Sequence, residues 1–516
     1  MPDTIPEILV AAAERDPDGV WLRTDDGTLT FSGTAGQVAR LARCLHDEGV
    51  RHGDLVVMTA RTTPTYLLCW FALASLGAVT VPTDPSGTAQ ELAGLVTQVQ
   101  PRIVVTDAAM HDVMSASGIA DAATLLDIDV LLGDWRLPDT TVAAGPSVTV
   151  TPDDLAVLIP TSGTTGKSKL VMQTHRAYAM AGVGFPYWME LDATDRLMTS
   201  LPLFHINAPA YSVLGSLSCG AGLILLPRFS ASRFLDSARR HGATEFNAIG
   251  AMLEILMRQP SRPDDADTPL RLCYTGPSPA REWQEAFEER FGLRVVCGYA
   301  MSESPYGLIW RHGTRPFGTL GSPRQHPTLG TVNEARVVDD NNQALGPGET
   351  GELLLRNPTV TPGYWGMPDE TAAAVVDGWM HTGDLVTVND DGTYTFVARR
   401  KEVLRRRGLN LSPAEVEDAI GSHPDVLEVA VVGVPSELTE DEVKAFVVAK
   451  QGHVLDFAEL RAWTGTRLSA FKVPQFWQEI DALPRTPTSR IAKHRLPAGH
   501  PAGEYDAEAG PGGPKD

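Results

Sequence analysis

Helical patterns and short apolar runs alternate along the first two thirds of the chain. From residue 6 to about residue 330, helical periodicity is interrupted by the β-branched runs DLVVMTA, RIVVTD, LAVLIP and AGLILLP. Such strands, separated by helices, are typical of an α/β fold with mainly parallel sheets. The most apolar stretch, residues 67–81, is shorter than the roughly 20 residues that a membrane span needs. We therefore expect it to form a buried helix followed by a strand.

The pattern changes after about residue 330. Up to residue 397, TVNEARVVDD, GELLLR and GTYTFVA are short alternating strands separated by turn residues, as in a small antiparallel barrel or sandwich. After residue 400 the pattern is α+β: SPAEVEDAIGSHP predicts a capped helix, VLEVAVVGV and VKAFVVAK predict strands, and DFAELRAWTGTRL predicts a second helix. Residues 497–516 are rich in Gly, Pro and acid without periodicity, which predicts a disordered tail.

Composition narrows the classes of partner. The chain has 516 residues, too many for one hydrophobic core, so two or more domains are expected. Its 43 basic and 64 acidic residues give a net charge of -21, which disfavours nucleic acid and anionic membranes as partners. The N-terminus carries acidic residues where a signal peptide is basic. Five dispersed cysteines without CxxC spacing indicate neither a disulfide framework nor a zinc site, so we expect a cytoplasmic protein.

A loop rich in glycine, threonine and lysine follows the run LAVLIP directly. Glycine tolerates tight turns, and backbone N–H groups, hydroxyls and ammonium groups can then surround phosphate oxygens. A Walker loop needs a glycine five positions before Gly166, where this chain has Thr161. Taken alone, the cluster could also be a polar surface turn with solvated lysines. The candidate phosphate ligands are Thr161, Ser162, Gly163, Thr164, Thr165, Gly166, Lys167 and Lys169.

TSGTTGKSK resembles the signature of the adenylate-forming superfamily, which includes acyl- and aryl-CoA ligases, peptide-synthetase adenylation domains and luciferases. LPLFHINA, CGYAMSES, DGWMHTGDL and ARRKEVLRRRGLNLSPAEVE follow in the order of that family's other motifs. The resemblance covers about residues 5–497. It implies an α/β fold: two doubly wound α/β subdomains and a small β-barrel form a large N-terminal domain at residues 1–400. A small mobile α+β domain follows at residues 401–496, before the tail at 497–516.

The resemblance also implies roles for residues of the N-terminal domain. His205 would wall the acyl pocket, although a lone histidine after an apolar run is more often structural. Tyr299 would stack on adenine, and Ser302 would touch the α-phosphate. Glu303 would hold Mg²⁺, because one carboxylate plus phosphate oxygens and water is a common magnesium site. Ala300 stands where the family has glycine. In YTGPSPARE, the turn at Gly276 and Pro277 would run past adenine.

Three further positions follow from the resemblance. Asp384 would bind both ribose hydroxyls, a task that suits a carboxylate because it accepts two hydrogen bonds side by side. Arg399 would be the second ribose ligand. Lys401 would stand at the hinge, and Gly408 would lie in a loop that lines the pantetheine tunnel. In isolation, Asp384 could be a turn residue, and the basic run 405–407 could be a solvated face.

One motif departs from the family pattern. The family ends on Pro-x-x-x-x-Gly-Lys, whose lysine reaches the adenylation site, whereas LPRTPTSRIAKHRL places Ser489 and Arg490 at these positions. Arginine keeps the charge, but its planar fork differs from the compact ammonium of lysine. Three explanations are open: Arg490 does the work of the lysine, Lys493 replaces it, or the activated substrate is not an ordinary carboxylic acid.

The resemblance implies an ATP-dependent enzyme that forms an acyl-adenylate, releases pyrophosphate and transfers the acyl group to coenzyme A. Arg490, Lys167, Thr161, Glu303 and His205 are its expected catalytic residues, and ATP, Mg²⁺ and coenzyme A its expected cofactors. No carrier-protein pattern follows residue 496, so a stand-alone enzyme acting on a small molecule is expected. One alternative is a ligase-like diazotase of secondary metabolism that uses nitrite and an aryl amine. Another is an inactive nucleotide-binding homologue.

Overall fold

The computed structural model of the chain describes residues 2–87, 89–116, 123–136, 145–161, 169–276, 278–326, 328, 330–400, 404–406, 409–435, 441–468, 472–486, 491–497, 499 and 504–507. The chain divides into two compact units. Unit 1 comprises Met1–Arg336, Leu354–Thr382 and Asp391–Tyr394, and unit 2 comprises Val337–Leu353, Gly383–Asp390 and Thr395–Asp516. The functional domain boundary at residue 400 stays a prediction.

One sheet of unit 1 has six strands. In spatial order they are β6 (Thr124–Asp127), β5 (Ile103–Thr106), β3 (Leu55–Thr59), β4 (Val79–Pro82), β7 (Leu155–Thr161) and β8 (Lys169–Thr174). The strands are parallel except β8, which runs antiparallel to β7. The strands predicted from DLVVMTA, RIVVTD and LAVLIP are confirmed as β3, β5 and β7.

A second sheet of unit 1 has nine strands. Their order is β15 (Ser322–Pro323), β14 (Ser304–Ile309), β13 (Arg294–Met301), β12 (Leu272–Thr275), β11 (Glu245–Asn247), β9 (Arg196–Thr199), β10 (Gly222–Leu225), β1 (Val20–Thr24) and β2 (Gly27–Thr30). From β13 to β1 the strands are parallel, and antiparallel strands lie at both edges. The carboxyl ends of β9, β11 and β12 therefore lie side by side.

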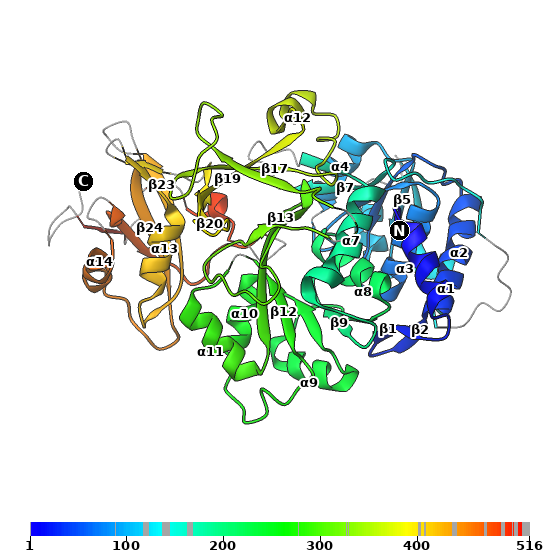
Figure 1. Cartoon of the computed structure of the whole chain (residues 1–516), viewed down its shortest axis with the longest axis horizontal. Helices are drawn as coiled ribbons and strands as arrows, with labels where there is room; N and C mark the ends of the chain where they lie inside the picture. The colour runs from blue at the N-terminus through cyan, green and yellow to red at the C-terminus, as the bar shows by residue number, and fades with distance from the viewer. Residues whose placement is uncertain are drawn as a thin grey trace. The chain divides into compact units, whose positions relative to one another are not determined.

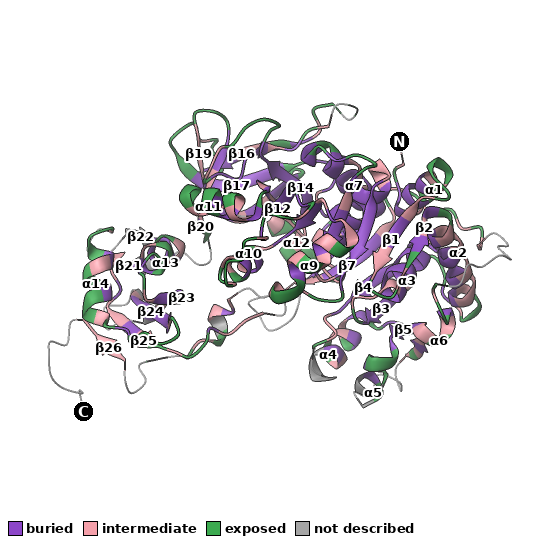
Figure 2. Cartoon of the chain, turned by 90° about the horizontal axis from the view of Figure 1, so that it is seen from below, coloured by how far each residue is buried: buried purple, intermediate pink, exposed green. Residues whose placement is uncertain are grey.

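Helices join these strands and cover the sheets (Figure 1). They are α1 (Ile5–Arg15), α2 (Phe31–Asp47), α3 (Pro64–Ser75), α4 (Ala89–Val99), α5 (Ala108–Ala116), α6 (Ile128–Leu132), α7 (His175–Met189), the π-helix η2 (Ala208–Val213), α8 (Leu214–Cys219), α9 (Ala231–His241), α10 (Gly250–Met257), α11 (Arg281–Phe291) and α12 (Pro368–Ala374). Figure 2 shows β7 largely in the colour of buried residues. The buried helix and strand predicted at 67–81 are confirmed as α3 and β4.

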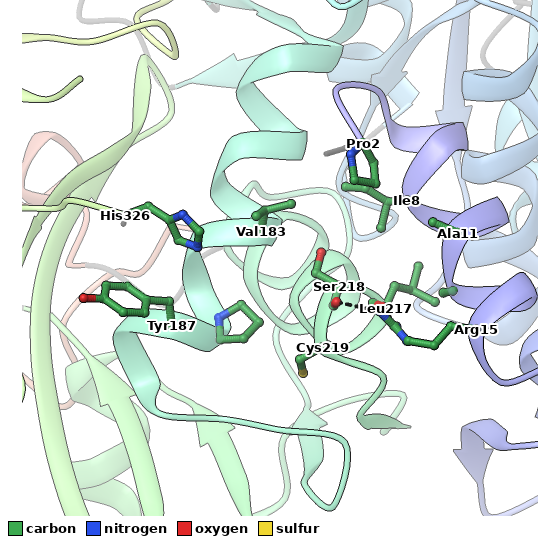
Figure 3. Close-up of a pocket in the computed structure, with 12 residues that line it drawn as sticks. Pro2, Ile8, Ala11, Arg15, Val183, Tyr187, Leu217, Ser218, Cys219 and His326 are labelled. Atoms are coloured by element: carbon green, nitrogen blue, oxygen red, sulfur yellow. Dashed lines mark hydrogen bonds between the residues drawn. The ribbon is translucent and has the colours of Figure 1, made fainter. Parts of the chain in front are cut away.

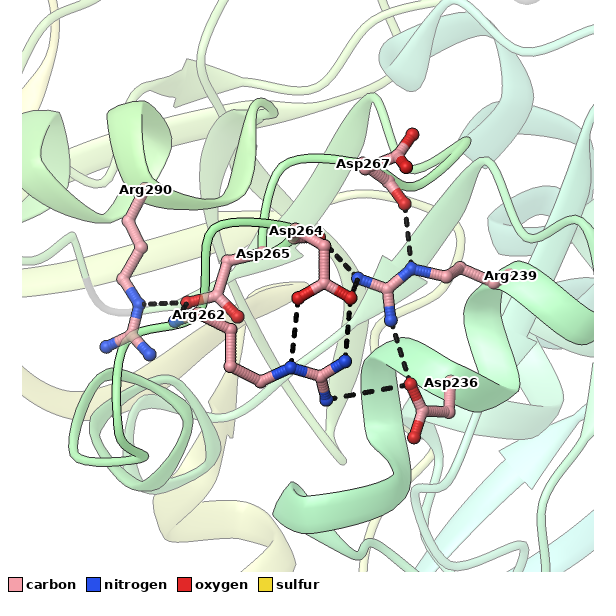
Figure 4. A network of polar contacts seen from close by, with 7 residues as sticks. All are labelled: Asp236, Arg239, Arg262, Asp264, Asp265, Asp267 and Arg290. Atoms are coloured by element: carbon pink, nitrogen blue, oxygen red, sulfur yellow. Dashed lines mark hydrogen bonds and ion pairs between the residues drawn. The ribbon is translucent and has the colours of Figure 1, made fainter.

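Charged side chains hold the segment between α10 and β12 in place (Figure 4). Arg239 on α9 pairs with Asp236 at 2.8 Å and donates to the backbone oxygen of Asp267 at 2.8 Å. Arg290 on α11 pairs with Asp265 at 2.8 Å, and both of these side chains are largely buried. Loss of one partner from a buried ion pair strongly destabilises the folded protein. The Arg290–Asp265 pair therefore anchors this segment before β12.

The strands predicted after residue 330 form a five-stranded sheet. Its order is β16 (Glu334–Val338), β17 (Thr350–Arg356), β19 (Trp379–Val388) and β18 (Val375–Val376), and β20 (Tyr394–Arg399) pairs with β19. TVNEARVVDD, GELLLR and GTYTFVA contain β16, β17 and β20, as predicted.

The rest of unit 2 has the predicted α+β pattern. A hairpin of β21 (Leu404–Arg406) and β22 (Leu409–Leu411) precedes α13 (Pro413–Gly421), β23 (Val426–Pro435), β24 (Asp441–Ala449), α14 (Phe457–Gly465), β25 (Phe476–Glu479), the short 3-10 helix η5 (Lys493–Arg495) and β26 (Tyr505–Asp506). The side-chain cap predicted for α13 is wrong: Ser412 stands at the N-cap position, but its hydroxyl donates to the backbone oxygen of Val397 at 2.8 Å.

The prediction of a disordered tail from 497 to 516 is wrong for residues 504–507. Tyr505 and Asp506 form β26, which pairs antiparallel with β25. The ring of Tyr505 lies 5.9 Å from that of Phe457, and Glu504 pairs with the fully buried Lys444 at 2.6 Å. Composition missed this strand because one aromatic residue and one acidic residue supply its tertiary contacts.

Candidate functional site

The glycine-rich segment joins two paired strands of unit 1. Thr161 ends β7 and Lys169 begins β8, and the two residues are partners in the antiparallel register. The hydroxyl of Thr161 also donates to the backbone oxygen of Lys169 at 3.2 Å. The two ends of the predicted phosphate loop are thereby fixed beside each other. Residues 162–168, which include Ser162, Gly163, Thr164, Thr165, Gly166 and Lys167, lie outside the described residues.

Tyr364 connects the end of this loop to the predicted metal ligand. Nζ of Lys169 lies 4.4 Å from the centre of the Tyr364 ring, within the range of a cation–π contact. The hydroxyl of Tyr364 donates to Oε1 of Glu303 at 3.0 Å. Tyr364 is 7% exposed, and burial together with the neighbouring Glu303 carboxylate raises the pKa of the phenol. One largely buried side chain thus contacts both candidate residues.

The segment around Tyr364 is held against β8 by its backbone. Gly363 accepts from the backbone N–H of Met172 at 3.0 Å, and Trp365 donates to the backbone oxygen of Leu170 at 2.9 Å. Gly363 has φ of 139°, and a Cβ there would lie 2.3 Å from Cγ2 of Thr371. A side chain at this position would therefore move the segment that carries Tyr364.

Ser302 and Glu303 form the turn between β13 and β14, because Met301 and Ser304 are partners in that hairpin. The backbone oxygen of Glu303 accepts from the N–H of Thr361 at 2.7 Å. Gln173 on β8 is fully buried and donates to the backbone oxygen of Ser302 at 2.6 Å. The turn is therefore tied to the same strand that begins at Lys169.

The predicted adenine-binding turn adjoins this hairpin. Gly276 directly follows β12, and a Cβ at this position would lie 2.3 Å from the backbone oxygen of Gly298 on β13. Glycine is needed here because the two backbones approach so closely. Tyr299 comes next to Gly298, and its hydroxyl contacts Sδ of Met301 at 3.8 Å. Pro277 lies outside the described residues.

His205 lies in the loop between β9 and η2. Its ring is 4.6 Å from that of Phe204. Two residues later, Oδ1 of Asn207 accepts from Nδ2 of Asn247, the last residue of β11, at 2.8 Å. This pair joins the loop of His205 to the carboxyl edge of the nine-stranded sheet, where open α/β sheets bind their ligands.

Unit 2 brings together the two predicted ribose ligands. Asp384 lies on β19 and Arg399 ends β20, which pairs with β19. Nε of Arg399 is 2.9 Å from Oδ1 of Asp384, whose side chain is 2% exposed, whereas that of Arg399 is 50% exposed. The pairing of a buried carboxylate with an accessible guanidinium leaves the cation open to solvent.

The region of the unusual final motif is described only in part. Gly408, Lys401 and Arg490 lie outside the described residues. Lys493 begins η5, and its Nζ lies 2.8 Å from Oε1 of Glu417 on α13. Glu417 also accepts from the backbone N–H of Val431 at 2.6 Å. Lys493 is therefore engaged in an ion pair of unit 2.

A cavity of about 380 Å³ lies apart from these residues, between α1, α7 and α8 of unit 1. Figure 3 shows Tyr187 and His326 on one side of it and Arg15 on the other. Arg15 donates to the backbone oxygens of Leu217 and Ser218, near the end of α8. None of the sequence-predicted candidates that the structure describes lines this cavity.

Comparison with known families decides the identity. The sequence pattern described as AMP-binding enzyme matches residues 9–365, well over half of the chain. The chain belongs to the AMP-binding enzyme family. A second pattern, the AMP-binding enzyme C-terminal domain, matches residues 415–490.

Curated relatives of this AMP-binding enzyme include crotonobetaine/carnitine–CoA ligases. That of Salmonella paratyphi B is 32% identical over 481 residues, which cover 89% of this chain and 91% of the relative. That of Salmonella typhi is 33% identical over 479 residues, with the same coverage of both chains.

Solved structures show the same fold. ATP-bound MatB from Rhodopseudomonas palustris is 26% identical, with a TM-score of 0.85 over 96% of this chain and 98% of that one. The o-succinylbenzoate CoA synthetase of Bacillus subtilis, in complex with its acyl-adenylate intermediate, is 25% identical, with a TM-score of 0.83 and the same coverage.

These matches confirm the predicted superfamily, the α/β fold with a large N-terminal and a small C-terminal domain, and the prediction of an AMP-forming ligase of the acyl- or aryl-CoA type. No helix in the described part of this AMP-binding enzyme combines the length and the apolar character that a membrane span requires. Sequence reasoning missed Tyr364 and Gln173. The two aromatic residues between Gly363 and Gly366, Tyr364 and Trp365, were the available signal for Tyr364.

Proposed function

We propose that this enzyme activates a carboxylic acid with ATP, releases pyrophosphate and transfers the acyl group to coenzyme A. The observation that carries the proposal is the arrangement around Tyr364. It brings Lys169, at the end of the glycine-rich loop, and the carboxylate of Glu303 to one side chain. A cation and a carboxylate beside a phosphate loop suit a triphosphate with its metal ion.

In the first step, a carboxylate oxygen of the acid attacks the α-phosphorus of ATP. The new O–P bond forms as the bond to the bridging oxygen breaks, which gives the acyl-adenylate and pyrophosphate. Negative charge is redistributed over the phosphate oxygens, and fixed cations and N–H donors stabilise it. We assign this work to Lys169, Ser302 and loop residues 161–167, Lys167 among them.

The position of Glu303 suits the predicted role of Mg²⁺ ligand. Its backbone is fixed by Thr361 and its Oε1 by Tyr364, so the carboxylate is held in one orientation. Within the described residues, no group of three or more His, Cys, Asp and Glu side chains could hold a metal ion. Mg²⁺ at nucleotide sites takes one or two carboxylates and completes its shell with phosphate oxygens and water. When bound, Mg²⁺ would neutralise charge on the phosphates.

The remaining roles concern nucleotide recognition and the second step. Tyr299 and the turn at Gly276 and Pro277 would bind adenine, Asp384 and Arg399 would bind the ribose, and His205 would wall the acyl pocket. In the second step the sulfur of coenzyme A attacks the acyl carbon, its proton leaves to solvent, and the C–O bond to AMP breaks. Gly408 would line the path of the thiol.

Arg490 is proposed to do the work of the family lysine. Lys493, the nearest other candidate, is paired with Glu417, which favours Arg490 over Lys493. The guanidinium would bridge the substrate carboxylate and the nucleotide, a geometry that suits its planar fork. Arg490→Lys should then retain or raise pyrophosphate release, and a collapse of activity would indicate a specialised role for the arginine.

The test is pyrophosphate release over a panel of carboxylic acids with and without coenzyme A, plus nitrite with an aryl amine. Release with an acid, followed by an acyl-CoA product when coenzyme A is present, supports the proposal. Release only with nitrite and the amine would overturn the proposal in favour of the diazotase. The diazotase is considered because Arg490 stands where the family has lysine. ATP binding without release from any substrate would indicate an inactive homologue.

A further inference from the structure

Three neighbouring parallel strands of unit 1 end in buried polar side chains. Ser200 follows β9, Asn247 ends β11 and Thr275 ends β12, and these strands are adjacent in the order β12, β11, β9. Asn247 and Thr275 are each 1% exposed, and Ser200 is 8% exposed. In the parallel register Asn247 is level with Tyr274 and Phe246 with Met198, so Ser200 and Thr275 lie one residue further along their strands. The three positions make up a staggered row at the carboxyl edge of the nine-stranded sheet.

Each of these side chains has a polar atom without a hydrogen-bond partner among the described residues. The atoms are Oγ of Ser200, Oδ1 of Asn247 and Oγ1 of Thr275. Buried polar groups are almost always paired in folded proteins, so a row of unpaired ones needs an explanation. A bound ligand would supply the missing partners, and the carboxyl edge of an open α/β sheet is where such folds bind their ligands.

Asn247 shows which kind of hydrogen-bonding group the row lacks. Its Nδ2 donates to Oδ1 of Asn207 at 2.8 Å, so its unpaired atom is the acceptor Oδ1. Asn207 stands two residues after His205, the proposed wall of the acyl pocket. The partner that Oδ1 lacks is an O–H or N–H donor.

We infer that Asn247 is a specificity-determining residue that selects acids carrying a hydrogen-bond donor, a hydroxyl or an amino group, on the part of the molecule remote from the reacting carboxylate. Resting on the proposed function, the inference adds the substrate class. Ser200, Asn207, Asn247 and Thr275 are all uncharged, so they offer no counter-charge to a second carboxylate. The amide dipoles and hydroxyls instead suit a neutral polar substituent.

The expected discrimination is large. A site built to bond a hydroxyl rejects the analogue without it by roughly 10⁴-fold in favourable cases, because the protein group is left buried and unpaired. An apolar acid would leave Oδ1 of Asn247 in that state. We therefore expect a preference of at least about 100-fold in kcat/KM for the donor-bearing acid.

The experiment compares acids that differ only in the donor. The probes are benzoate with its hydroxy, amino and methoxy derivatives, and butanoate and hexanoate with their hydroxy derivatives, assayed for pyrophosphate release and acyl-CoA. The methoxy acids keep the oxygen of the hydroxy acids but cannot donate and are larger by one methyl group, and the unsubstituted acids control for size. We expect kcat/KM to be higher for the hydroxy and amino acids than for the methoxy and unsubstituted acids. Asn247→Leu, which is nearly isosteric and apolar, should reduce this preference at least about tenfold.

Asn341→Ala, in an exposed turn, is the matched control and should change nothing. ATP binding of Asn247→Leu should match the wild type, and thermal unfolding measures what the loss of its bond to Asn207 costs, which separates specificity from folding. Activation of unsubstituted or methoxy acids as well as their hydroxy partners would overturn the inference while leaving the proposed function standing. An unchanged preference in Asn247→Leu would do the same. Absence of release with every acid would overturn both.

Discussion

The hydroxyl of Tyr364 donates to Oε1 of Glu303 at 3.0 Å while its ring lies 4.4 Å beneath Nζ of Lys169. Sixty-one positions separate Tyr364 from Glu303 in the sequence. The tyrosine orients a carboxylate through its hydroxyl and a cation through its ring. Substitutions can separate these two tasks, because phenylalanine keeps the ring and loses the hydroxyl.

Tyr364→Phe should raise the Mg²⁺ concentration needed for half-maximal pyrophosphate release about tenfold, because hydrogen bonds to charged groups contribute about 1.5–3 kcal/mol. The KM for the acid should stay unchanged. Tyr364→Leu should add a defect in ATP binding, since it also removes the contact with Lys169. Tyr394→Phe, which loses a 3.5 Å bond to the backbone of Ala335, is the matched control. An unaltered Mg²⁺ requirement in Tyr364→Phe would refute this role.

Asp384→Ala should abolish the preference of the enzyme for ATP over 2′,3′-dideoxy-ATP. If Asp384 accepts from both ribose hydroxyls, the variant should lose about 10–100-fold in kcat/KM with ATP and almost nothing further with the dideoxy nucleotide. Kinetics with both nucleotides and both proteins complete a double-mutant cycle. Additive losses from the two changes would show that Asp384 does not contact the ribose.

His175 makes the folded enzyme sensitive to acid. It is fully buried, its Nδ1 accepts from the backbone N–H of Ile5 at 3.4 Å, and burial lowers its pKa from 6.5 to about 4. Because the folded pKa is the lower one, the unfolded chain takes up the proton first. Stability from this group is therefore complete above about pH 6.5 and is lost as the pH falls toward 4.

Urea unfolding between pH 7 and pH 4.5 measures this loss. His175→Asn keeps an acceptor near the position of Nδ1 but does not titrate, so its stability should fall less steeply with acid than that of the wild type. His52→Asn, at a partly exposed histidine that contacts Asp154 at 3.1 Å, is the control. Identical pH slopes for wild type and His175→Asn would contradict the assignment.

Glu504→Gln should destabilise unit 2. Nζ of Lys444 is fully buried, lies 2.6 Å from Oε1 of Glu504 and donates to the backbone oxygen of Gly499 at 2.9 Å. Removal of one partner from a buried pair costs about 3–5 kcal/mol, because the other charge stays buried. Denaturant unfolding followed by tryptophan fluorescence should show the loss. Asp506→Asn, two residues further on in β26 and only partly buried, should be nearly neutral, and an equal effect of both changes would argue against the ion pair.

Local patterns predicted the elements, whereas contacts between distant segments escaped prediction. The run before Thr161 and the loop up to Lys169 are contiguous, so the apolar run and the glycine content were enough to predict β7 and the loop after it, whereas β8 was not predicted. Asp384 and Arg399 were expected at one site only because each matched a family motif, and their ion pair was not predicted. No local signal links Tyr364 to Glu303, or Asn247 to Asn207, because these contacts depend on tertiary folding. Ser412 had the sequence of a cap, but the backbone of Val397 competed for its hydroxyl.

The two units are interleaved along the chain, and four strands cross a boundary between them. These strands are β16, β17, β19 and β20, and each begins in one unit and ends in the other. A gene shuffled between relatives at a single crossover near residue 400 would therefore leave Val337–Leu353 and Gly383–Asp390 with the wrong parent. Exchange of the whole of unit 2 requires the transfer of three separate gene segments, so recombination can preserve its packing only when those segments are inherited together.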